Sequence, residues 1–153
     1  AENQTLVEPK AAVTPVTEPE VIMQTTLKHE ITVSGVGLHT GAKVNLTFKP
    51  APENHGYIFK RVDLPGQPIV EADVDNVTDT DRGTTISKNG AKVSTIEHVL
   101  AALAGSEIDN IMMEIDGPEV PIMDGSSRPF MDLFDKVGKI DPAIGIEIQA
   151  AKS

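Results

Sequence analysis

The chain is organised around residues 94–105, which read Ser94-Thr95-Ile96-Glu97-His98-Val99-Leu100-Ala101-Ala102-Leu103-Ala104-Gly105. Its larger apolar side chains recur at the spacing of one helix face, at Ile96, Val99, Leu100 and Leu103. Ser94, followed three residues later by Glu97, matches a capping box, and Gly105 is typical of a C-terminal stop. The stretch therefore predicts an amphipathic helix whose N-cap is Ser94.

Glu97 and His98 stand side by side in the first turn of this helix. A carboxylate beside a neutral imidazole could place a general base next to a metal ligand. The alternative is that Glu97 only caps the helix and that His98 is a surface or half-buried histidine without a chemical role. Short motifs of this kind often arise by chance, so the helix alone favours the alternative.

The composition excludes several classes of protein. The chain has 153 residues, 39% of them hydrophobic but only 3% aromatic and with no Trp, so we expect a single core of Val, Ile, Leu, Ala and Met. A net charge of −10 argues against nucleic-acid binding, because phosphates are neutralised by Lys and Arg. The absence of Cys excludes disulfides, thiolate zinc sites and a Cys nucleophile.

Three parts are expected along the chain. Residues 1–22 have no helix or strand period and are rich in Val, Thr, Pro and Glu, which predicts a disordered extension or linker. Residues 23–140 form the domain, and residues 141–153 form a C-terminal tail. No apolar run reaches the roughly 20 residues that span a bilayer, and no export signal is evident, so we expect no transmembrane segment and a cytoplasmic location.

The order of the periodic segments predicts the fold class. Runs typical of strands lie at 27–33, 44–48, 57–62, 69–74, 84–87, 91–93 and 110–115, the last as a central strand. Asn89-Gly90 is a strong hairpin signal between two of them. A second helix follows Ser126 or Ser127 and ends at Gly138. We predict an α+β fold, a two-layer sandwich of a mainly antiparallel sheet with two helices packed on one face.

The spacing of the histidines does not reveal a metal site. His29, His39, His55 and His98 have no His or Asp four residues further on, and the H-E-x-x-H pattern of zinc hydrolases is absent. A catalytic zinc normally has three protein ligands, and His98 is the one plausible ligand here. His29 is expected in a strand and His55 in an exposed turn, without a chemical role. Spacing alone supports an α+β domain and nothing more specific.

Four segments taken together are far more specific. They are Gly35-Val36-Gly37-Leu38-His39-Thr40-Gly41, Ser94-Thr95-Ile96-Glu97-His98, Ile108-Asp109-Asn110 and Pro118-Glu119-Val120-Pro121-Ile122-Met123-Asp124-Gly125-Ser126. The three glycines of the first segment predict a tight turn or a close backbone approach. In this order and spacing the segments resemble the N-terminal half of UDP-3-O-acyl-N-acetylglucosamine deacetylase, the zinc amidase of lipid A biosynthesis. The resemblance covers about residues 24–139.

The resemblance implies an enzyme in which a zinc-bound water lies between two α+β domains of like fold. His98 matches the zinc ligand from the first domain. Glu97 matches the general base, which takes a proton as the water attacks the acetamide carbonyl of the substrate. The resemblance thus favours a chemical role for both residues, although Glu97 could also cap the helix.

Further residues match the family around this pair. Leu38 and His39 match the glycine-rich segment near the active-site cleft. Arg82 and Gly83 lie where the backbone of the first domain lines the sugar pocket. Asp124 matches an aspartate that either orients other residues of the site without contacting the substrate itself or stabilises the fold.

The chain departs from the family in its ligand set. The second and third zinc ligands come from an H-K-x-x-D segment of the second domain, which is absent here. The expected partners are UDP-3-O-acyl-N-acetylglucosamine and a missing second domain, toward which the 141–153 tail leads. With an incomplete ligand set for Zn²⁺, the chain alone is expected to be inactive or nearly so. The alternative is a non-catalytic domain that pairs with a second-domain partner or binds acyl-sugar without turnover.

Overall fold

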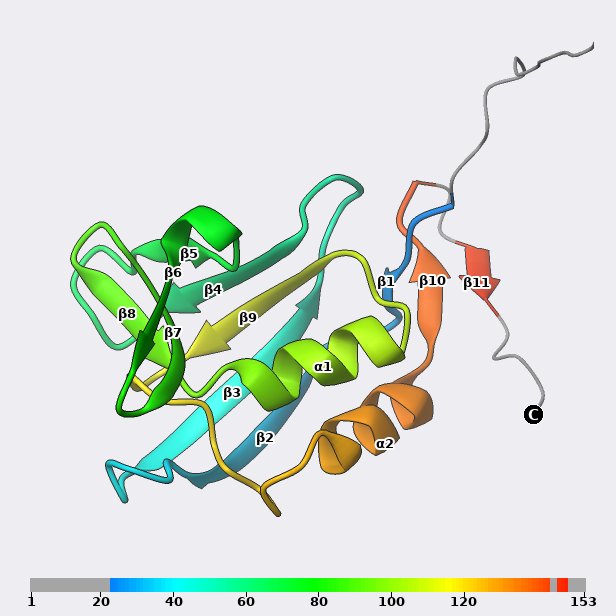
Figure 1. Ribbon diagram of the computed structural model, residues 1–153. Coiled ribbons are helices and arrows are strands. Elements are labelled where there is room, and N and C mark those ends of the chain that lie inside the picture. The colour runs from blue at the N-terminus through cyan, green and yellow to red at the C-terminus, as the bar shows by residue number, and fades with distance from the viewer. Residues whose placement is uncertain (1–22, 144–145, 149–153) are drawn as a thin grey trace, which may run out of the picture.

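The computed structural model describes residues 23–143 and 146–148 (Figure 1). Its largest sheet has five strands in the order β2-β3-β9-β4-β5. These strands are β2 (Ile31–Val36), β3 (Lys43–Pro50), β9 (Ile111–Ile115), β4 (Tyr57–Arg61) and β5 (Ile69–Glu71). Neighbouring strands are antiparallel except for β4 and β9, which are parallel. The sheet is therefore mainly antiparallel, and β9 is its central strand, as predicted.

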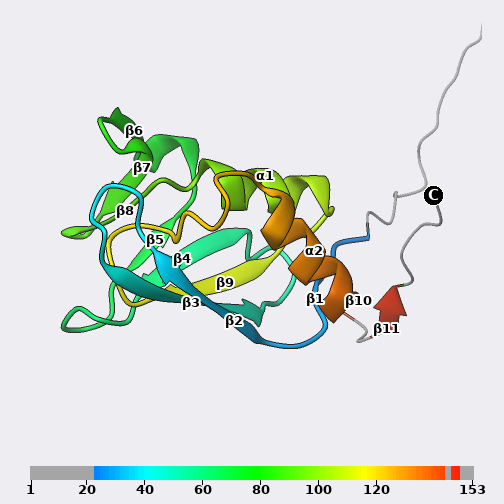
Figure 2. The ribbon, with the colours of Figure 1, turned by 90° about the horizontal axis from the view of Figure 1, so that it is seen from below.

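Two helices lie on the same face of this sheet, α1 (Glu97–Gly105) and α2 (Arg128–Val137) (Figure 2). Val44, Leu46 and Phe48, which alternate along β3, are buried, as alternation toward a helix layer requires. The ring of Phe48 on β3 packs edge-to-face against Phe134 of α2, with ring centroids 4.9 Å apart. This arrangement confirms the predicted α+β sandwich.

A three-stranded antiparallel sheet flanks the sandwich. It consists of β6 (Val77–Thr80), β7 (Gly83–Lys88) and β8 (Ala91–Ser94), and it follows the 3₁₀ helix η2 (Val74–Asn76). Asn89 and Gly90 join β7 to β8 with φ angles of 56° and 78°. Both positive values fit the tight turn that this dipeptide favours, so the predicted hairpin is confirmed.

The predicted strand at 27–33 is wrong, because the chain changes sheets within it. β1 (Thr26–Leu27) pairs with β10 (Lys139–Asp141), which also pairs with β11 (Ile146–Ile148), whereas β2 pairs with β3. The backbone N–H of Lys28 bonds to the carbonyl of Gly138 at 2.9 Å. The alternation of apolar residues continues from β1 into β2. Periodicity therefore could not reveal that these two strands pair with different partners.

The predicted N-cap of α1 is also wrong. Ser94 is the last residue of β8, and its N–H donates to the carbonyl of Pro118 at 2.8 Å. The helix begins at Glu97 with Ile96 in the N-cap position and no side-chain capping bond. Pairing between Ser94 and a distant segment has outweighed the local capping signal.

The second helix follows the prediction, whereas His29 and His55 do not. Ser127 directly precedes α2 and Gly138 ends it. His29 is exposed in the link between β1 and β2 rather than in a strand. His55 is half-buried rather than exposed, and its Nδ1 lies 3.0 Å from the carbonyl oxygen of Gly56.

The predicted extension of residues 1–22 and the final residues 149–153 lie outside the described residues, and the domain boundaries stay predictions.

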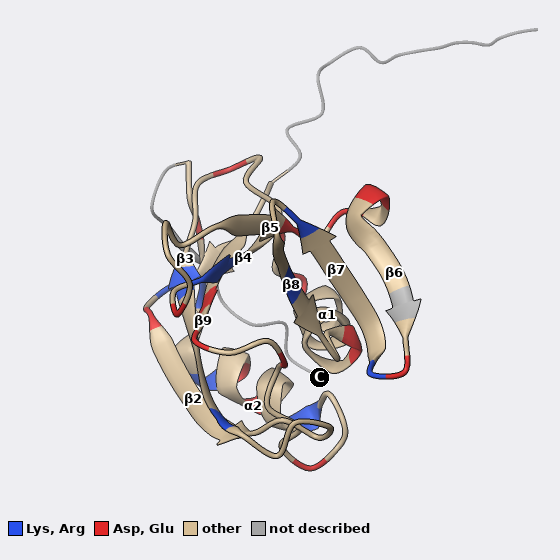
Figure 3. Cartoon of the chain, turned by 90° about the vertical axis from the view of Figure 1, so that its left-hand side faces the viewer, with Lys and Arg blue, Asp and Glu red and all other residues tan. Residues whose placement is uncertain are grey.

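None of the helices in the described part of the chain has the length and hydropathy of a membrane-spanning segment. Figure 3 shows the Lys and Arg residues spread over several separate elements of that part.

Candidate active site

Glu97 opens α1, and its carboxylate lies against the start of β7. Its Oε1 accepts a hydrogen bond from the backbone N–H of Thr84 at 3.3 Å. Gly83 has a φ of 86°, and a Cβ there would stand 2.6 Å from Oε2 of Glu97. A glycine is therefore needed for this close approach. The hydrogen bond leads to β7 and not to the N–H groups of α1, which contradicts the capping interpretation.

His98 is half-buried beside Glu97, and its ring has no hydrogen-bond partner among the described residues. Asp124 lies nearby on the exposed loop before α2, where its Oδ1 accepts hydrogen bonds from the hydroxyl and the N–H of Ser126. The hydroxyl of Ser126 and, to a smaller extent, the nearby His98 ring lower the pKa of Asp124. Two of the predicted site residues, His98 and Asp124, thus lie near one another, with no hydrogen bond or ion pair between them among the described residues.

The glycine-rich segment forms the tight turn between β2 and β3. Gly37 and Gly41 close it, because the N–H of Gly41 donates to the carbonyl of Gly37 at 2.9 Å. The side chain of Leu38 projects from the turn and is 58% exposed. A Cβ on Gly37 would stand 2.5 Å from Oε1 of Glu119. The predicted close approach is real, and the group that approaches is the side chain of Glu119.

Glu119 is a site residue that reasoning from the sequence missed. It is only 1% exposed. Its carboxylate accepts hydrogen bonds from the N–H groups of His39 and Thr40, from Nδ1 of His39 at 2.7 Å and from Oγ1 of Thr95 at 2.8 Å. Burial raises the pKa of Glu119, but the hydrogen bonds from His39, Thr40 and Thr95 outweigh it and lower the pKa to about 2.

One signal for Glu119 was available. It is the single charged residue in the apolar run Pro118-Glu119-Val120-Pro121-Ile122. This run makes isolated bridges to Ser94 on one side and to Gly37 on the other, rather than a full strand. A lone acid inside a segment buried from both sides needs donors around it. The identity of those donors, His39 and Thr40 about 80 positions away and Thr95 24 positions away, has no local signal.

Thr95 links this network to the start of α1. Its φ is 61°, in the left-handed region that β-branched residues rarely adopt. Its Oγ1 lies 2.8 Å from the carbonyl of Arg82 and 2.8 Å from Oε2 of Glu119. Arg82, predicted at the site, therefore contacts it through its backbone, while its side chain is exposed.

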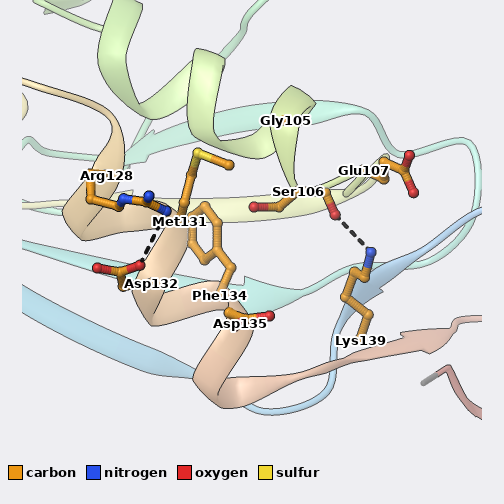
Figure 4. Close-up of a pocket in the computed structure, with 9 residues that line it drawn as sticks. All are labelled: Gly105, Ser106, Glu107, Arg128, Met131, Asp132, Phe134, Asp135 and Lys139. Carbon is orange, nitrogen blue, oxygen red and sulfur yellow. Dashed lines mark hydrogen bonds and ion pairs between the residues drawn. The ribbon is translucent and has the colours of Figure 1, made fainter. Parts of the chain in front are cut away.

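A groove of about 390 Å³ lies at the other end of α1 (Figure 4). Gly105, the last residue of α1, and Ser106, which follows it, line the groove together with Met131 and Phe134 of α2. Nζ of Lys139 donates to the carbonyl of Ser106 at 2.7 Å. A helix rises about 1.5 Å per residue, so this end is roughly 12 Å from Glu97. The groove is separate from the Glu97–His98 pair.

The donor set for a metal ion is partial. Among the described residues no group of three or more His, Cys, Asp or Glu side chains could hold a metal. A catalytic zinc takes three protein ligands, and the unpaired ring of His98 fits one of them. Chemically, the site offers a carboxylate base beside a single nitrogen donor, with Gly83 against the base and Asp124 near the ring.

Known proteins match most of the chain. Residues 24–149 match the model of the family described as LpxC: UDP-3-O-acyl N-acetylglycosamine deacetylase. The bifunctional enzyme LpxC/FabZ of Bacteroides thetaiotaomicron is 52% identical over 118 residues, which are 77% of this chain and 26% of that protein. The UDP-3-O-acyl-N-acetylglucosamine deacetylase of Xanthomonas oryzae is 51% identical over 120 residues, 77% of this chain and 39% of that protein.

The deacetylase of Myxococcus xanthus gives a similar match, 48% identity over 78% of this chain and 38% of the relative. The chain thus spans between about a quarter and two fifths of the length of these curated relatives. The match covers the glycine-rich turn, the Glu97–His98 pair and the segment around Glu119. This chain belongs to the LpxC family of UDP-3-O-acyl N-acetylglycosamine deacetylases.

Proposed function

We propose that this chain carries one part of the active site of a zinc-dependent deacetylase that hydrolyses the acetamide of UDP-3-O-acyl-N-acetylglucosamine in lipid A biosynthesis. The observation that carries the proposal is the pair at the start of α1. Among the described residues, the Glu97 carboxylate accepts a single long hydrogen bond and the adjoining His98 ring has no hydrogen-bond partner. Both groups therefore remain available for chemistry, and the family supplies the substrate class.

Glu97 acts as the general base in this proposal. Its carboxylate keeps lone pairs open beyond the bond from Thr84, so it can take a proton from the water that attacks the acetamide carbonyl. A zinc ion, when bound, supplies Lewis acidity to this reaction. His98 fits as one of its ligands, and Asp124 supports the orientation of that ring. Gly83 keeps the backbone of β7 close to the base.

The other proposed site residues face the substrate from two sides. Leu38 and His39 contribute from the β2–β3 turn, where both side chains are accessible. Gly83 contributes from the first position of β7, and Arg82 from the residue just before it. Their roles in substrate binding, and the cytoplasmic location expected from the sequence, stay predictions.

The remaining zinc ligands are proposed to come from a second domain outside this chain. The described residues offer one ligand, and the curated relatives are much longer than the matched segment. We therefore expect the chain by itself to be inactive or nearly so. The partner domain would complete the coordination and close the site over the substrate.

A non-catalytic role is the second candidate. Val36, Leu38 and Met123 are exposed apolar side chains around the glycine-rich turn. Val36 and the segment before Met123 are neighbours, because the carbonyl of Val36 accepts a hydrogen bond from the N–H of Ile122. Such a surface suits pairing with another domain or binding of an acyl chain without turnover.

A chimera tests the two candidates. Residues 24–149 replace the matching segment of the Xanthomonas oryzae relative, and deacetylation and zinc content are measured. Glu97→Gln should lower kcat about 10²- to 10⁴-fold with zinc content unchanged, since a general base contributes roughly that much. His98→Ala should lower the zinc content as well. A folded chimera that binds zinc but never turns over favours the second candidate, and full activity of Glu97→Gln contradicts the first.

A further inference from the structure

The buried carboxylate of Glu119 connects two segments that are distant in sequence. Its Oε2 lies within hydrogen-bond distance of both Nδ1 of His39, in the β2–β3 turn, and Oγ1 of Thr95, between β8 and α1. Its Oε1 accepts from the N–H groups of His39 and Thr40. One side chain thus joins the glycine-rich turn to the segment that leads into Glu97 and His98.

The bonding pattern fixes which ring nitrogen of His39 carries hydrogen. An ionised carboxylate only accepts hydrogen bonds, so Nδ1 of His39 must be the donor over their 2.7 Å separation. In a neutral ring Nε2 is then an unprotonated acceptor. The side chain of His39 is 34% exposed while that of Glu119 is 1% exposed. The edge of the ring away from Glu119, which includes Nε2, therefore faces outward.

The geometry of Thr95 indicates that the same carboxylate also holds the backbone. A β-branched residue at a φ of 61° is strained, and such a conformation persists only where its surroundings over-determine it. The single hydroxyl hydrogen of Thr95 lies between two acceptors, Oε2 of Glu119 and the carbonyl oxygen of Arg82, each 2.8 Å from Oγ1, and these contacts supply that constraint. Glu97 follows two residues later.

We propose that Glu119 is a positioning residue: it holds His39 in the Nδ1–H form, with Nε2 turned outward to accept a hydrogen bond from a hydroxyl or amide N–H of the ligand. In the same way it holds the Thr95 turn that aims Glu97. The part that concerns the ligand rests on the proposed function. The tautomer does not, because it follows from contacts within this chain.

Nuclear magnetic resonance of the full chain tests the tautomer without zinc or substrate. Long-range ¹H–¹⁵N correlations are recorded at alkaline pH, where histidine rings are neutral. His39 should show protonated Nδ1 and unprotonated Nε2. His55 serves as an internal reference, because its Nδ1 faces the carbonyl of Gly56 and should be protonated in every variant. An Nε2–H form of His39 in the unaltered chain overturns the proposal.

Glu119→Gln separates a positioning role from a space-filling one. The glutamine has nearly the same shape, but its amide NH₂ can only donate. It should shift the His39 ring toward the Nε2–H form, with Nδ1 accepting, while His55 is unchanged. A folded variant in which His39 keeps Nδ1–H overturns the proposal. If the variant does not fold, the tautomer of His39 in the unaltered chain still tests the proposal.

The ligand part is tested in the chimera described above. His39→Gln should raise KM roughly three- to tenfold, the range expected for the loss of one neutral hydrogen bond, with a smaller effect on kcat. An unchanged KM overturns the ligand part. Should no active chimera exist, the proposed function fails while the tautomer result stands, so the two failures are distinguishable.

Discussion

Gly83 sets how closely the backbone of β7 approaches the Glu97 carboxylate. Both Gly83 and Gly90 have positive φ angles, 86° and 78°, but a Cβ at Gly90 would meet nothing within 4 Å. We expect Gly83→Ala and Gly90→Ala to destabilise the fold by a similar amount, about 1–2 kcal/mol, because both place an L side chain in the left-handed region. Only Gly83→Ala should displace Glu97.

Urea unfolding of the two glycine variants, together with deacetylase assays of the chimera, checks this expectation. Activity should fall in Gly83→Ala and be retained in Gly90→Ala at temperatures where both are folded. Equal activity of the two would show that the contact between Gly83 and Glu97 has no influence on the base.

Because of Glu119, the free energy of unfolding of the domain should decrease as the pH falls into the acid range. Its pKa is about 2 in the folded chain against an ordinary value of 4.5. The unfolded chain therefore binds the proton first as the pH falls, and stability is lost between about pH 4.5 and pH 2. The full loss is at most about 3 kcal/mol, from 1.36 kcal/mol for each pKa unit.

The free energy of unfolding of the unaltered chain and of Glu119→Gln is compared at pH 5.5 and pH 3. Other carboxyls with lowered pKa values, Asp63, Glu71 and Asp124, remain in both proteins, so the difference between the two isolates Glu119. The advantage of the unaltered chain should shrink at pH 3. An advantage that stays constant or grows would contradict the argument.

At the scale of elements, α2 is held to the sheet by aromatic packing. Phe134 is 1% exposed and contacts Phe48 edge-to-face. Phe134→Ala should lower the free energy of unfolding by about 3–5 kcal/mol, the usual range for a buried aromatic residue. The neighbouring Asp135 is exposed, so Asp135→Ala should change it by no more than about 0.5 kcal/mol. Equal effects in thermal or urea unfolding would mean that α2 does not pack as described.

The elements also show what the sequence could predict. The two helices, the central strand and the Asn89-Gly90 hairpin were predictable, because each has its signal within a few residues. The break between β1 and β2 and the true start of α1 were not, since both depend on bonds to Gly138 and Pro118 far along the chain. A local sequence pattern does not specify which other strand a given strand pairs with.

The site was predictable to a similar degree. Glu97 and His98 could be singled out because they are adjacent and match a known family. Glu119 could not be assigned, because its partners His39 and Thr95 are brought to it only by the tertiary fold. The proposed roles of all these residues stay predictions until the variants are measured.

At the scale of the whole molecule, a single nitrogen donor should hold zinc weakly. Isothermal titration of the purified chain with Zn²⁺ should show weak, substoichiometric binding, because the described residues provide no group of three ligands. His98→Ala should remove part of the residual signal. Tight stoichiometric binding that is lost in His98→Ala would mean that two copies of the chain build a complete site together.

The position of β9 has a consequence for how the chain folds. β9 lies between β3 and β4, so the β2–β3 and β4–β5 hairpins share a sheet only through a strand that begins at Ile111. Both hairpins leave the ribosome well before that strand does. Until β9 inserts, each hairpin has an open edge of backbone groups, and closing the sheet requires contacts of long sequence separation, which slow folding. We expect the nascent chain to be most prone to aggregation in this interval.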